Sequence, residues 1–314
     1  MVSVTKGLEA GTHKRMSEVV AETTGREVVA LTGPSHAEEV AIDVPTGLLA
    51  ACKDQKKAEF VQDAFMSDSL RVYTSPDPVG AELGGALKNV IALCAGITDG
   101  LGCGDNTKAM LMTRGLTETA RLGVSLGAHK DTFAGLAGVG DLIVTCTSMH
   151  SRNRRAGILI GQGKDAQTAM KEVGAVVEGY YAAKSAYELG QRQGIDMPIT
   201  EAAYKVLYEN ADVTETFSAL MSRAKKAEPE DAGWLKKIRA LPQGVPDLLL
   251  RNKIKNAAEN SAAYFIATGN QIARSTLLER RHLVQAYAWQ GVPLTTALTR
   301  LTLGFHARLE RLWE

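Results

Sequence analysis

The sequence lacks the features that assign a chain to a membrane or to a nucleic acid. Its 36 Lys and Arg residues stand against 35 Asp and Glu, which leaves a net charge of +1. A balance this close to zero does not favour nucleic acid or an anionic membrane surface as a partner. No uninterrupted apolar run of about 18 residues predicts a membrane span, and the N-terminus has no secretory pattern. We therefore expect a cytoplasmic protein.

Cysteine is also scarce. The four cysteines, Cys52, Cys94, Cys103 and Cys146, are scattered along the chain, and no two have the CxxC spacing typical of a metal site. Three of them lie in apolar surroundings. We predict reduced thiols in the protein core, as is usual in the cytosol, and no bound metal.

The chain does contain enough apolar sequence for a sizeable core. Its 314 residues are 45% hydrophobic and 23% charged, as in an ordinary soluble globular protein, and this length suits two domains or one domain with an appendage. The charge is divided unevenly. Residues 229–314 carry twelve Lys or Arg and seven Asp or Glu, or +5, which leaves 24 against 28, or −4, for residues 1–228.

Short strands and helices alternate at the start of the chain, which is typical of α/β layering. Strands are predicted at residues 2–4, 27–31, 46–52 and 71–73, and helices at 13–21, at 35–40 and through Phe60 and Phe65. From Pro76 to about Lys226 helical periodicity dominates, interrupted by Gly-rich loops at 100–104 and 135–140. The sequence therefore predicts a partial α/β sheet over residues 1–76 and a larger all-α domain over residues 77–228.

The last part of the chain is separate from these two. A plausible linker occupies residues 228–231 and is rich in acidic residues. Beyond it, a stripe of apolar residues at helical spacing is formed by Leu294, Leu298, Leu301, Phe305, Leu309 and Leu312. We predict a helical extension over residues 229–314.

Lys88 is the one charged residue in a long apolar helix. No other Asp, Glu, Lys or Arg lies between Glu82 and Asp99, and apolar residues recur there at three- and four-residue steps. Gly84 and Gly85 precede it by one turn, so another backbone or a small ligand can come close to the amine. Burial would lower the pKa of the lysine towards the range that suits base chemistry. The alternative is a lysine that reaches solvent along its own aliphatic stem.

Asp141 is the acidic counterpart of that lysine. It is the only Asp, Glu, Lys or Arg between Asp131 and Arg152, and its surroundings are apolar. A carboxylate in such a place usually has a specific partner or caps a helix. An isolated lysine and an isolated aspartate in one domain would be natural partners.

Four further segments carry candidate binding groups. They are Lys6-Gly7 at the end of a strand, the strand-to-helix turn from Leu31 to His36, the basic helix start from Ser151 to Arg155, and Val176–Gly179. A strand end and a helix N-terminus both suit oxygen-rich ligands, and Arg, hydroxyl and amide donors at a helix start suit phosphate. The alternatives are a surface lysine, a capped turn and a solvated basic turn.

Taken together, six strings identify a resemblance. They are TKG at 5–7, LTGPSHAE at 31–38, ELGGALKN at 82–89, GVGDLIVT at 138–145, HSRNR at 150–154 and VVEG at 176–179. In order and spacing they resemble the bacterial NAD(P)-dependent sn-glycerol-3-phosphate dehydrogenase family, from Val2 to about Glu228. Several of them are long and unusual, so the resemblance is specific.

The resemblance implies reversible hydride transfer between NAD or NADP and a small phosphorylated substrate, sn-glycerol 3-phosphate or dihydroxyacetone phosphate, which supplies phospholipid synthesis. It implies a catalytic set of Lys88, Lys6 and Asp141, with Lys88 as the acceptor of the C2 hydroxyl proton. The implied substrate contacts are Lys6, Gly33, Ser35, Lys88, Asp141, Ser151, Arg152 and Asn153. The implied cofactor contacts are Lys6, Ala37, Arg152, Val176 and Glu178.

The chain departs from the family pattern in two places. The family begins with a strand, a Gly-rich turn and a helix that bind the dinucleotide pyrophosphate, and neither Gly-rich segment of this chain has that context. We therefore expect that the chain lacks this segment and that residues 1–76 form the second part of a dinucleotide-binding domain, a partial Rossmann-like sheet. Residues after Glu228 lie outside the pattern.

Two other functions stay open at this point. One is a truncated, non-catalytic module for phosphate binding or oligomerisation, for which a homodimer is one option. The other is a dehydrogenase for a different hydroxy acid, although Ser151-Arg152-Asn153 favours a phosphorylated one.

Overall fold

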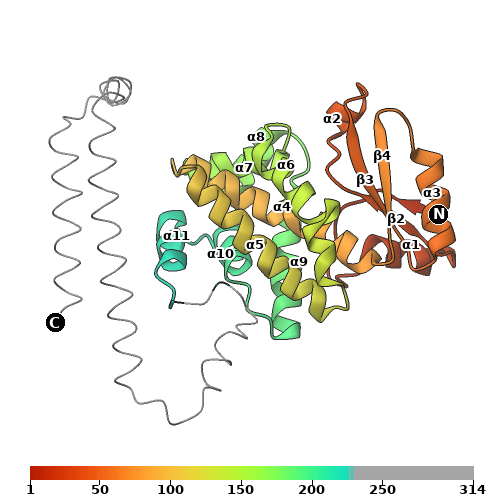
Figure 1. Cartoon of the computed structure of the whole chain (residues 1–314). Coiled ribbons are helices and arrows are strands. Elements are labelled where there is room, and N and C mark those ends of the chain that lie inside the picture. Colours follow the sequence, from red (N-terminus) through yellow and green to blue (C-terminus); the bar gives the residue numbers. More distant parts are fainter. Residues whose placement is uncertain (226–227, 229–314) are drawn as a thin grey trace, which may run out of the picture. The chain divides into compact units, whose positions relative to one another are not determined.

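The first 75 residues build a small sheet with three helices beside it (Figure 1). This computed structural model describes residues 1–225 and residue 228. In chain order the elements are β1 (Val2–Ser3), α1 (Met16–Thr24), β2 (Val29–Thr32), α2 (Ala37–Val40), β3 (Thr46–Ala51), α3 (Gln55–Phe65) and β4 (Leu70–Ser75). The alternation of strands and helices predicted from the sequence is confirmed. The predicted extension over 229–314, with its apolar stripe, lies outside the described residues.

The expected partial Rossmann-like sheet is present, but it is mixed, because one of its three strand pairings is antiparallel. The strand order is β1-β2-β3-β4; β1 pairs with β2 and β3 with β4 in parallel, whereas β2 and β3 are antiparallel. Two neighbouring parallel strands must be joined by a crossover that brings the chain back to the end where the first strand began. This crossover is usually an α-helix. The helix between β2 and β3 is α2, which has only four residues. The chain therefore turns back along β2.

The rest of the described chain is helical, as predicted. The elements are α4 (Pro78–Gly100), α5 (Asp105–Ser125), η1 (Lys130–Ala134), η2 (Leu136–Gly140), α6 (Asp141–Thr147), α7 (Arg152–Gly161), α8 (Ala166–Val173), α9 (Glu178–Gln193), α10 (Pro198–Tyr208) and α11 (Val213–Met221). The prediction of a Gly-rich loop at 135–140 is wrong, because residues 136–140 form the helical turn η2. Gly138 lies against the backbone of Phe133, where a Cβ would not fit.

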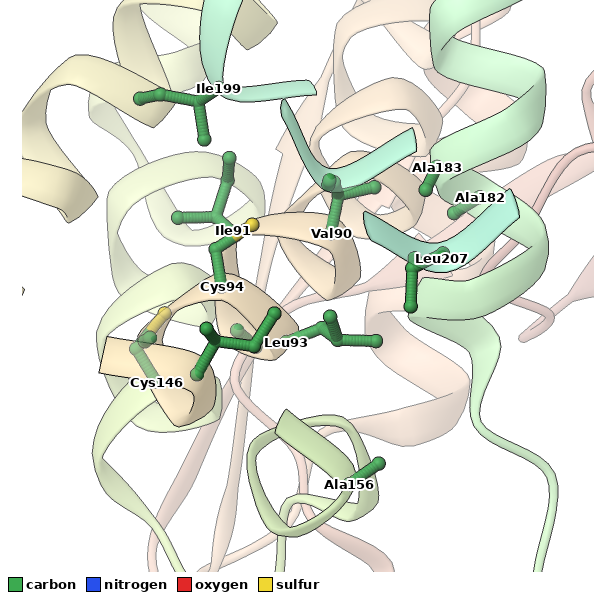
Figure 2. Packing of buried hydrophobic residues seen from close by; sticks show 14 of the residues in the cluster. Val90, Ile91, Leu93, Cys94, Cys146, Ala156, Ala182, Ala183, Ile199 and Leu207 are labelled. Carbon is green, nitrogen blue, oxygen red and sulfur yellow. The ribbon is translucent and has the colours of Figure 1, made fainter. Parts of the chain in front are cut away.

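Helix α4 is the centre of the helical part. Asp77 caps it through its Oδ1, which accepts from Gly80 N at 2.9 Å, and Pro78 occupies its first turn. Of its 23 residues, 20 are buried, and α5, α6, α7 and α9 pack around it. Figure 2 shows its side chains Val90, Ile91, Leu93 and Cys94 among those of the surrounding helices. The helix is long and apolar enough to cross a membrane, but here it is the buried core helix.

A buried carboxylate joins α4 to the sheet part of the chain. The carboxylate of Glu82 accepts hydrogen bonds from Ser17 N at 2.8 Å, Ser17 Oγ at 2.5 Å and Arg15 Nη1 at 2.6 Å. Ser17 lies in the first turn of α1, so these contacts hold the start of α1 against the first turns of α4.

Candidate functional site

Lys88 is buried and ion-paired. Only 7% of the residue is exposed, and its Nζ donates to Asp141 Oδ1 at 2.5 Å and to Thr145 Oγ1 at 2.6 Å. The alternative in which the amine reaches solvent is therefore wrong. The expected pairing of the isolated lysine with the isolated aspartate is confirmed.

Lys6 brings a second ammonium to the same carboxylate. It lies after β1, and its Nζ donates to Asp141 Oδ2 at 2.9 Å and to the carbonyl oxygen of Gly33 at 2.7 Å. Its side chain is 22% exposed, compared with 1% for that of Asp141. Lys6 is thus held between the sheet and α6 and is not a free surface lysine.

Asp141 is where the two lysines meet, one on each carboxylate oxygen. It is the first residue of α6, and the preceding Gly140 occupies the N-cap position. The interpretation of Asp141 as a helix cap is therefore wrong. Two ammonium groups on one carboxylate leave a net positive charge around an Asp141 side chain that is only 1% exposed.

This environment lowers the pKa of Lys88 to about 8. Burial is the main cause, because an ammonium loses its hydration there, and the positive charge of Lys6 acts in the same direction. The carboxylate of Asp141 opposes both effects. The Lys88 amine can therefore exchange a proton within one or two units of neutral pH.

Other parts of the chain lie close to α4 at the two glycines that precede Lys88. A Cβ on Gly84 would meet the carbonyl oxygen of Ala137, so the backbone of η2 lies directly on this glycine. A Cβ on Gly85 would come within 2.9 Å of Thr32 Oγ1 and 3.7 Å of Lys6 Cγ. The expectation that another backbone approaches this face is confirmed, and Lys6 reaches across it.

The turn after β2 supplies the other side of the site. Gly33 has φ +135°, and a Cβ there would lie 2.9 Å from the Gly47 carbonyl oxygen, so only glycine fits. Its carbonyl oxygen accepts from Lys6 and from the hydroxyl of Ser35 at 3.1 Å. This carbonyl thereby fixes Lys6 and Ser35 at the edge of the sheet that faces α6.

The start of α7 is held against α4 by its own side chains. Ser151 is the N-cap, and its Oγ accepts from Arg154 N at 3.2 Å. Asn153 is buried; it donates to Asn89 Oδ1 at 2.9 Å and accepts from Gly179 N at 2.7 Å. Both residues thus have structural partners, whereas Arg152 is exposed.

The residues expected to contact the cofactor lie on different elements: Glu178 and Val176 at the start of α9, and Ala37 at the start of α2. Glu178 opens α9, and its Oε2 lies 3.7 Å from where a Cβ on Gly7 would be, so it faces the Lys6-Gly7 turn. Val176, just before it, is 54% exposed. Ala37 is exposed at the start of α2, on the sheet part of the chain. Among the described residues, no hydrogen bond or ion pair joins Ala37 or Arg152 to Glu178.

Three polar residues near Lys88 escape sequence reasoning. Thr145 donates to the carbonyl oxygen of Asp141 at 2.6 Å and accepts from Lys88, and Asn89 holds Asn153. His36 is the N-cap residue of α2 and interacts electrostatically with Lys88 and Asp141. The one available signal was spacing, because Thr145 is four residues after Asp141 and so on the same helix face.

All four cysteines lie within residues 1–225, which the structure describes. In that part Cys52, Cys94 and Cys146 are buried free thiols, as predicted, while Cys103 is half-buried. The same part holds no group of three His, Cys, Asp or Glu side chains that could bind a metal ion.

Comparison with known sequences gives consistent results along the described chain. The pattern of the NAD-dependent glycerol-3-phosphate dehydrogenase N-terminus matches residues 1–58, and that of its C-terminus matches residues 77–218. A glycerol-3-phosphate dehydrogenase [NAD(P)+] of Desulfitobacterium hafniense is 55% identical over 245 residues, which cover 78% of this chain and 68% of the relative. One from a Thermoanaerobacter species is 59% identical over 228 residues, which cover 73% and 69%.

Solved structures agree. The chain resembles the glycerol-3-phosphate dehydrogenase of Coxiella burnetii with a TM-score of 0.68 and 38% identity, over 71% of this chain and 68% of that one. The enzyme of Saccharomyces cerevisiae gives a TM-score of 0.63 and 30% identity, over 69% and 66%. With the paired lysines and aspartate in place and these relatives over its first three quarters, the chain belongs to the NAD-dependent glycerol-3-phosphate dehydrogenase family.

Proposed function

We propose that this chain transfers a hydride reversibly between NAD(H) or NADP(H) and the pair sn-glycerol 3-phosphate and dihydroxyacetone phosphate, and so supplies phospholipid synthesis. The observation that carries the proposal is the Lys88 amine, buried against Asp141 with its pKa lowered to about 8. A group in that state can both give and take a proton near neutral pH.

Lys88 is the proton donor and acceptor. In ketone reduction a hydride adds to C2, and the Lys88 ammonium gives its proton to the carbonyl oxygen, which yields the C2 hydroxyl. In alcohol oxidation the neutral amine takes the hydroxyl proton as the hydride leaves C2. Both directions need the amine within hydrogen-bond distance of the C2 oxygen.

Lys6 and Asp141 set the charge around this exchange. Negative charge develops on the C2 oxygen during reduction, and two ammonium groups on one carboxylate leave the net positive charge that stabilises it. Because Asp141 contacts both lysines, it also fixes where their amines point. Thr145 Oγ1 accepts a second hydrogen bond from the Lys88 amine.

The phosphate of the substrate binds at the start of α7. Arg152 is exposed there and can form a paired contact with phosphate oxygens, and the free N–H groups of the first turn favour an anion. Ser151 keeps its hydroxyl proton for a phosphate oxygen while its Oγ caps the helix. Asn153 contributes mainly by holding α7 to Asn89 and Gly179.

The residues near Lys6 fit a nicotinamide dinucleotide. The bound cofactor supplies or accepts the hydride. Gly7 has no side chain and faces Glu178, which leaves a bare backbone beside a carboxylate that suits ribose hydroxyls. Lys6, Ala37, Arg152, Val176 and Glu178 would hold it.

The domain organisation follows from this assignment. Residues 1–76 would be the second part of a dinucleotide-binding domain and residues 77–228 the substrate domain, which agrees with family matches at 1–58 and 77–218. A cytoplasmic location and a homodimer remain predictions from the sequence.

The direct test is NADH oxidation by the purified full chain with dihydroxyacetone phosphate. Lys88→Met keeps the length of the buried side chain but removes the proton, so we expect kcat to fall by about 100-fold or more. Lys205→Met is the matched control, because Lys205 pairs with Glu201 on the exposed side of α10, and its rate should not change. Binding of the phosphate ester without NADH oxidation by the unmodified chain would instead support the non-catalytic phosphate-binding module.

A further inference from the structure

Arg154 is an arginine in the first turn of α7 that the mechanism above does not use. Arg152, two residues earlier, is exposed, whereas the side chain of Arg154 is only 14% exposed. The Nε of Arg154 donates to Asp99 Oδ2 at 2.9 Å, and its Nη2 lies 2.8 Å from the same oxygen. Asp99 lies in the last turn of α4, so this ion pair joins the start of α7 to the end of α4.

The remaining nitrogen of Arg154 reaches a third helix. Nη1 donates to the carbonyl oxygen of Thr147 at 3.0 Å and to Met149 Sδ at 2.9 Å. Thr147 is the last residue of α6, where a carbonyl lacks a partner within the helix and a positive charge is favourable. All three nitrogens of Arg154 therefore have partners in the chain, and the guanidinium is engaged before any ligand binds.

Asp99 and the backbone of α4 fix this arginine in place. Asp99 Oδ1 lies 2.8 Å from the Nζ of Lys108 on α5, so the carboxylate is held by a cation at each oxygen. A Cβ on Gly96, one turn before Asp99, would meet the carbonyl oxygen of Arg154. Helix α7 therefore contacts α4 at Arg154 through both the side chain and the backbone.

The contacts of Arg154 bridge the turn between two helices of the candidate site. This turn spans residues 148–151. It follows α6, whose first residue Asp141 pairs with Lys88, and precedes α7, whose first residue is Arg152. Arg154 belongs to the helix after the turn and binds the residue directly before it. Since the same guanidinium is tied to α4, which also carries Lys88, these contacts set where the start of α7 lies relative to the Lys88 amine.

We propose that Arg154 is a positioning residue, which holds the phosphate-binding start of α7 at the distance from Lys88 that a three-carbon phosphate ester spans. The inference rests on the proposed function, which supplies this substrate and binds its phosphate at α7. Arg154 acts through Arg152 and Ser151 and does not touch the phosphate itself. Without the tie to Asp99 the turn is no longer held, and an ester bound at its C2 oxygen loses part of its phosphate contacts.

The test uses two substitutions that separate positioning from direct binding. The dissociation constant of dihydroxyacetone phosphate is measured by calorimetry with the full chain and with its Arg154→Met and Asp99→Asn variants. Positioning predicts weaker binding in both variants, by about 10-fold, since small misplacements of binding groups cost up to about 100-fold. A guanidinium that bound the phosphate directly would instead be released in Asp99→Asn, and this variant would bind the ester at least as tightly as the unmodified chain.

Two further variants and a stability measurement complete the test. Arg154→Lys keeps a positive charge for Asp99, so it should recover part of the affinity that Arg154→Met loses. It carries the test together with Asp99→Asn if Arg154→Met does not fold. Arg223→Met is the matched control, because Arg223 pairs with Asp196 through an exposed contact, and its dissociation constant should not change. Denaturant unfolding of each variant then measures how much the same contacts contribute to stability.

Three results would overturn the inference. They are a lower free energy of unfolding in the Arg154 variants with an unchanged dissociation constant, which is a structural role alone, binding by Asp99→Asn as tight as in the unmodified chain, and NADH oxidation by Arg154→Met with an unchanged KM. Calorimetry needs no hydride transfer, so a chain that shows the expected shifts but does not oxidise NADH contradicts only the proposed function. No binding of the ester by the unmodified chain would overturn both.

Discussion

At the scale of single residues, the site depends on what surrounds one amine. Lys88 would be an ordinary surface base if it were solvated, because its pKa would then stay near 10.5. Burial lowers that pKa to about 8, while Asp141 keeps the ammonium form accessible. The lysine is thus useful in both directions of the reaction, and each direction needs a different protonation state.

This difference predicts opposite pH dependences for the two directions. Ketone reduction needs the Lys88 ammonium, so its kcat at saturating substrate should fall as the pH rises through about 8. Alcohol oxidation needs the neutral amine, so its kcat should rise through the same pH. Steady-state rates from pH 6 to 10 in both directions check this.

Asp141→Asn provides the control for the assignment of this titration. The carboxylate favours the charged lysine, so its removal should move the inflection of both profiles to lower pH, by about one to three units for a neighbouring opposite charge. An inflection that stayed at pH 8 in the variant would assign it to another group.

The sequence revealed the charged residues of the site but not its polar ones. Lys88 and Asp141 could be found because a charge in an apolar segment needs a partner, and that requirement does not depend on knowing the fold. Thr145, Asn89 and His36 gave no such signal, since hydroxyls, amides and imidazoles are common at helix surfaces and caps. Their contacts with the site depend on how α2, α4, α6 and α7 pack in the folded chain.

At the scale of elements, glycine decides how closely α4 and α7 approach. Gly157 and Gly161 on α7 lie on Gly96 and Gly100 of α4, and a Cβ at any of them would meet backbone atoms of the other helix. This close crossing places the start of α7 beside Asn89, the residue that follows Lys88. Periodicity predicted both helices, but the crossing could not be predicted because a glycine within a helix does not show which partner it faces.

Gly157→Ala should therefore destabilise the protein although alanine is the better helix former. Alanine would favour the helix by up to about 1 kcal/mol. Its Cβ would, however, meet the Leu93 carbonyl oxygen and lie 2.8 Å from Ile97 N, and overpacking of this kind costs about 1–3 kcal/mol or more. We expect a net loss in the free energy of unfolding and a raised KM for the phosphorylated ketone.

Denaturant unfolding and steady-state kinetics measure these two effects. Gly104→Ala is the control, because no atom lies within 4 Å of a Cβ there and its φ is −85°. An unchanged KM in Gly157→Ala would show that α7 tolerates a shift without loss of the phosphate site.

At the scale of the described chain, the site joins two parts of different architecture. Lys6 and Gly33 come from the sheet part, whereas Lys88 and Asp141 come from helices. The site therefore exists only while the sheet and helical parts keep their positions relative to each other. The sequence predicted both parts and the change near residue 76. The antiparallel pairing of β2 with β3 was not predicted, because the sequence indicates the two strands and the short helix between them but not the direction in which the strands pair.

Glu82 of α4 also joins the sheet and helical parts, through contacts that lie outside the candidate site. Its carboxylate is buried and accepts from Arg15 and Ser17, so Glu82→Ala leaves the Arg15 guanidinium without this partner. Breaking a buried ion pair by removing one partner costs about 3–5 kcal/mol, whereas an exposed pair contributes less than about 1 kcal/mol. We therefore expect a large loss in the free energy of unfolding from Glu82→Ala and almost none from Glu201→Ala, whose pair with Lys205 is exposed. These contacts join α1 to α4, the helix that carries Lys88, so we expect Glu82→Ala to lower kcat of ketone reduction as well. Equal stabilities of the two variants would show that the Glu82 contacts do not hold the sheet and helical parts together.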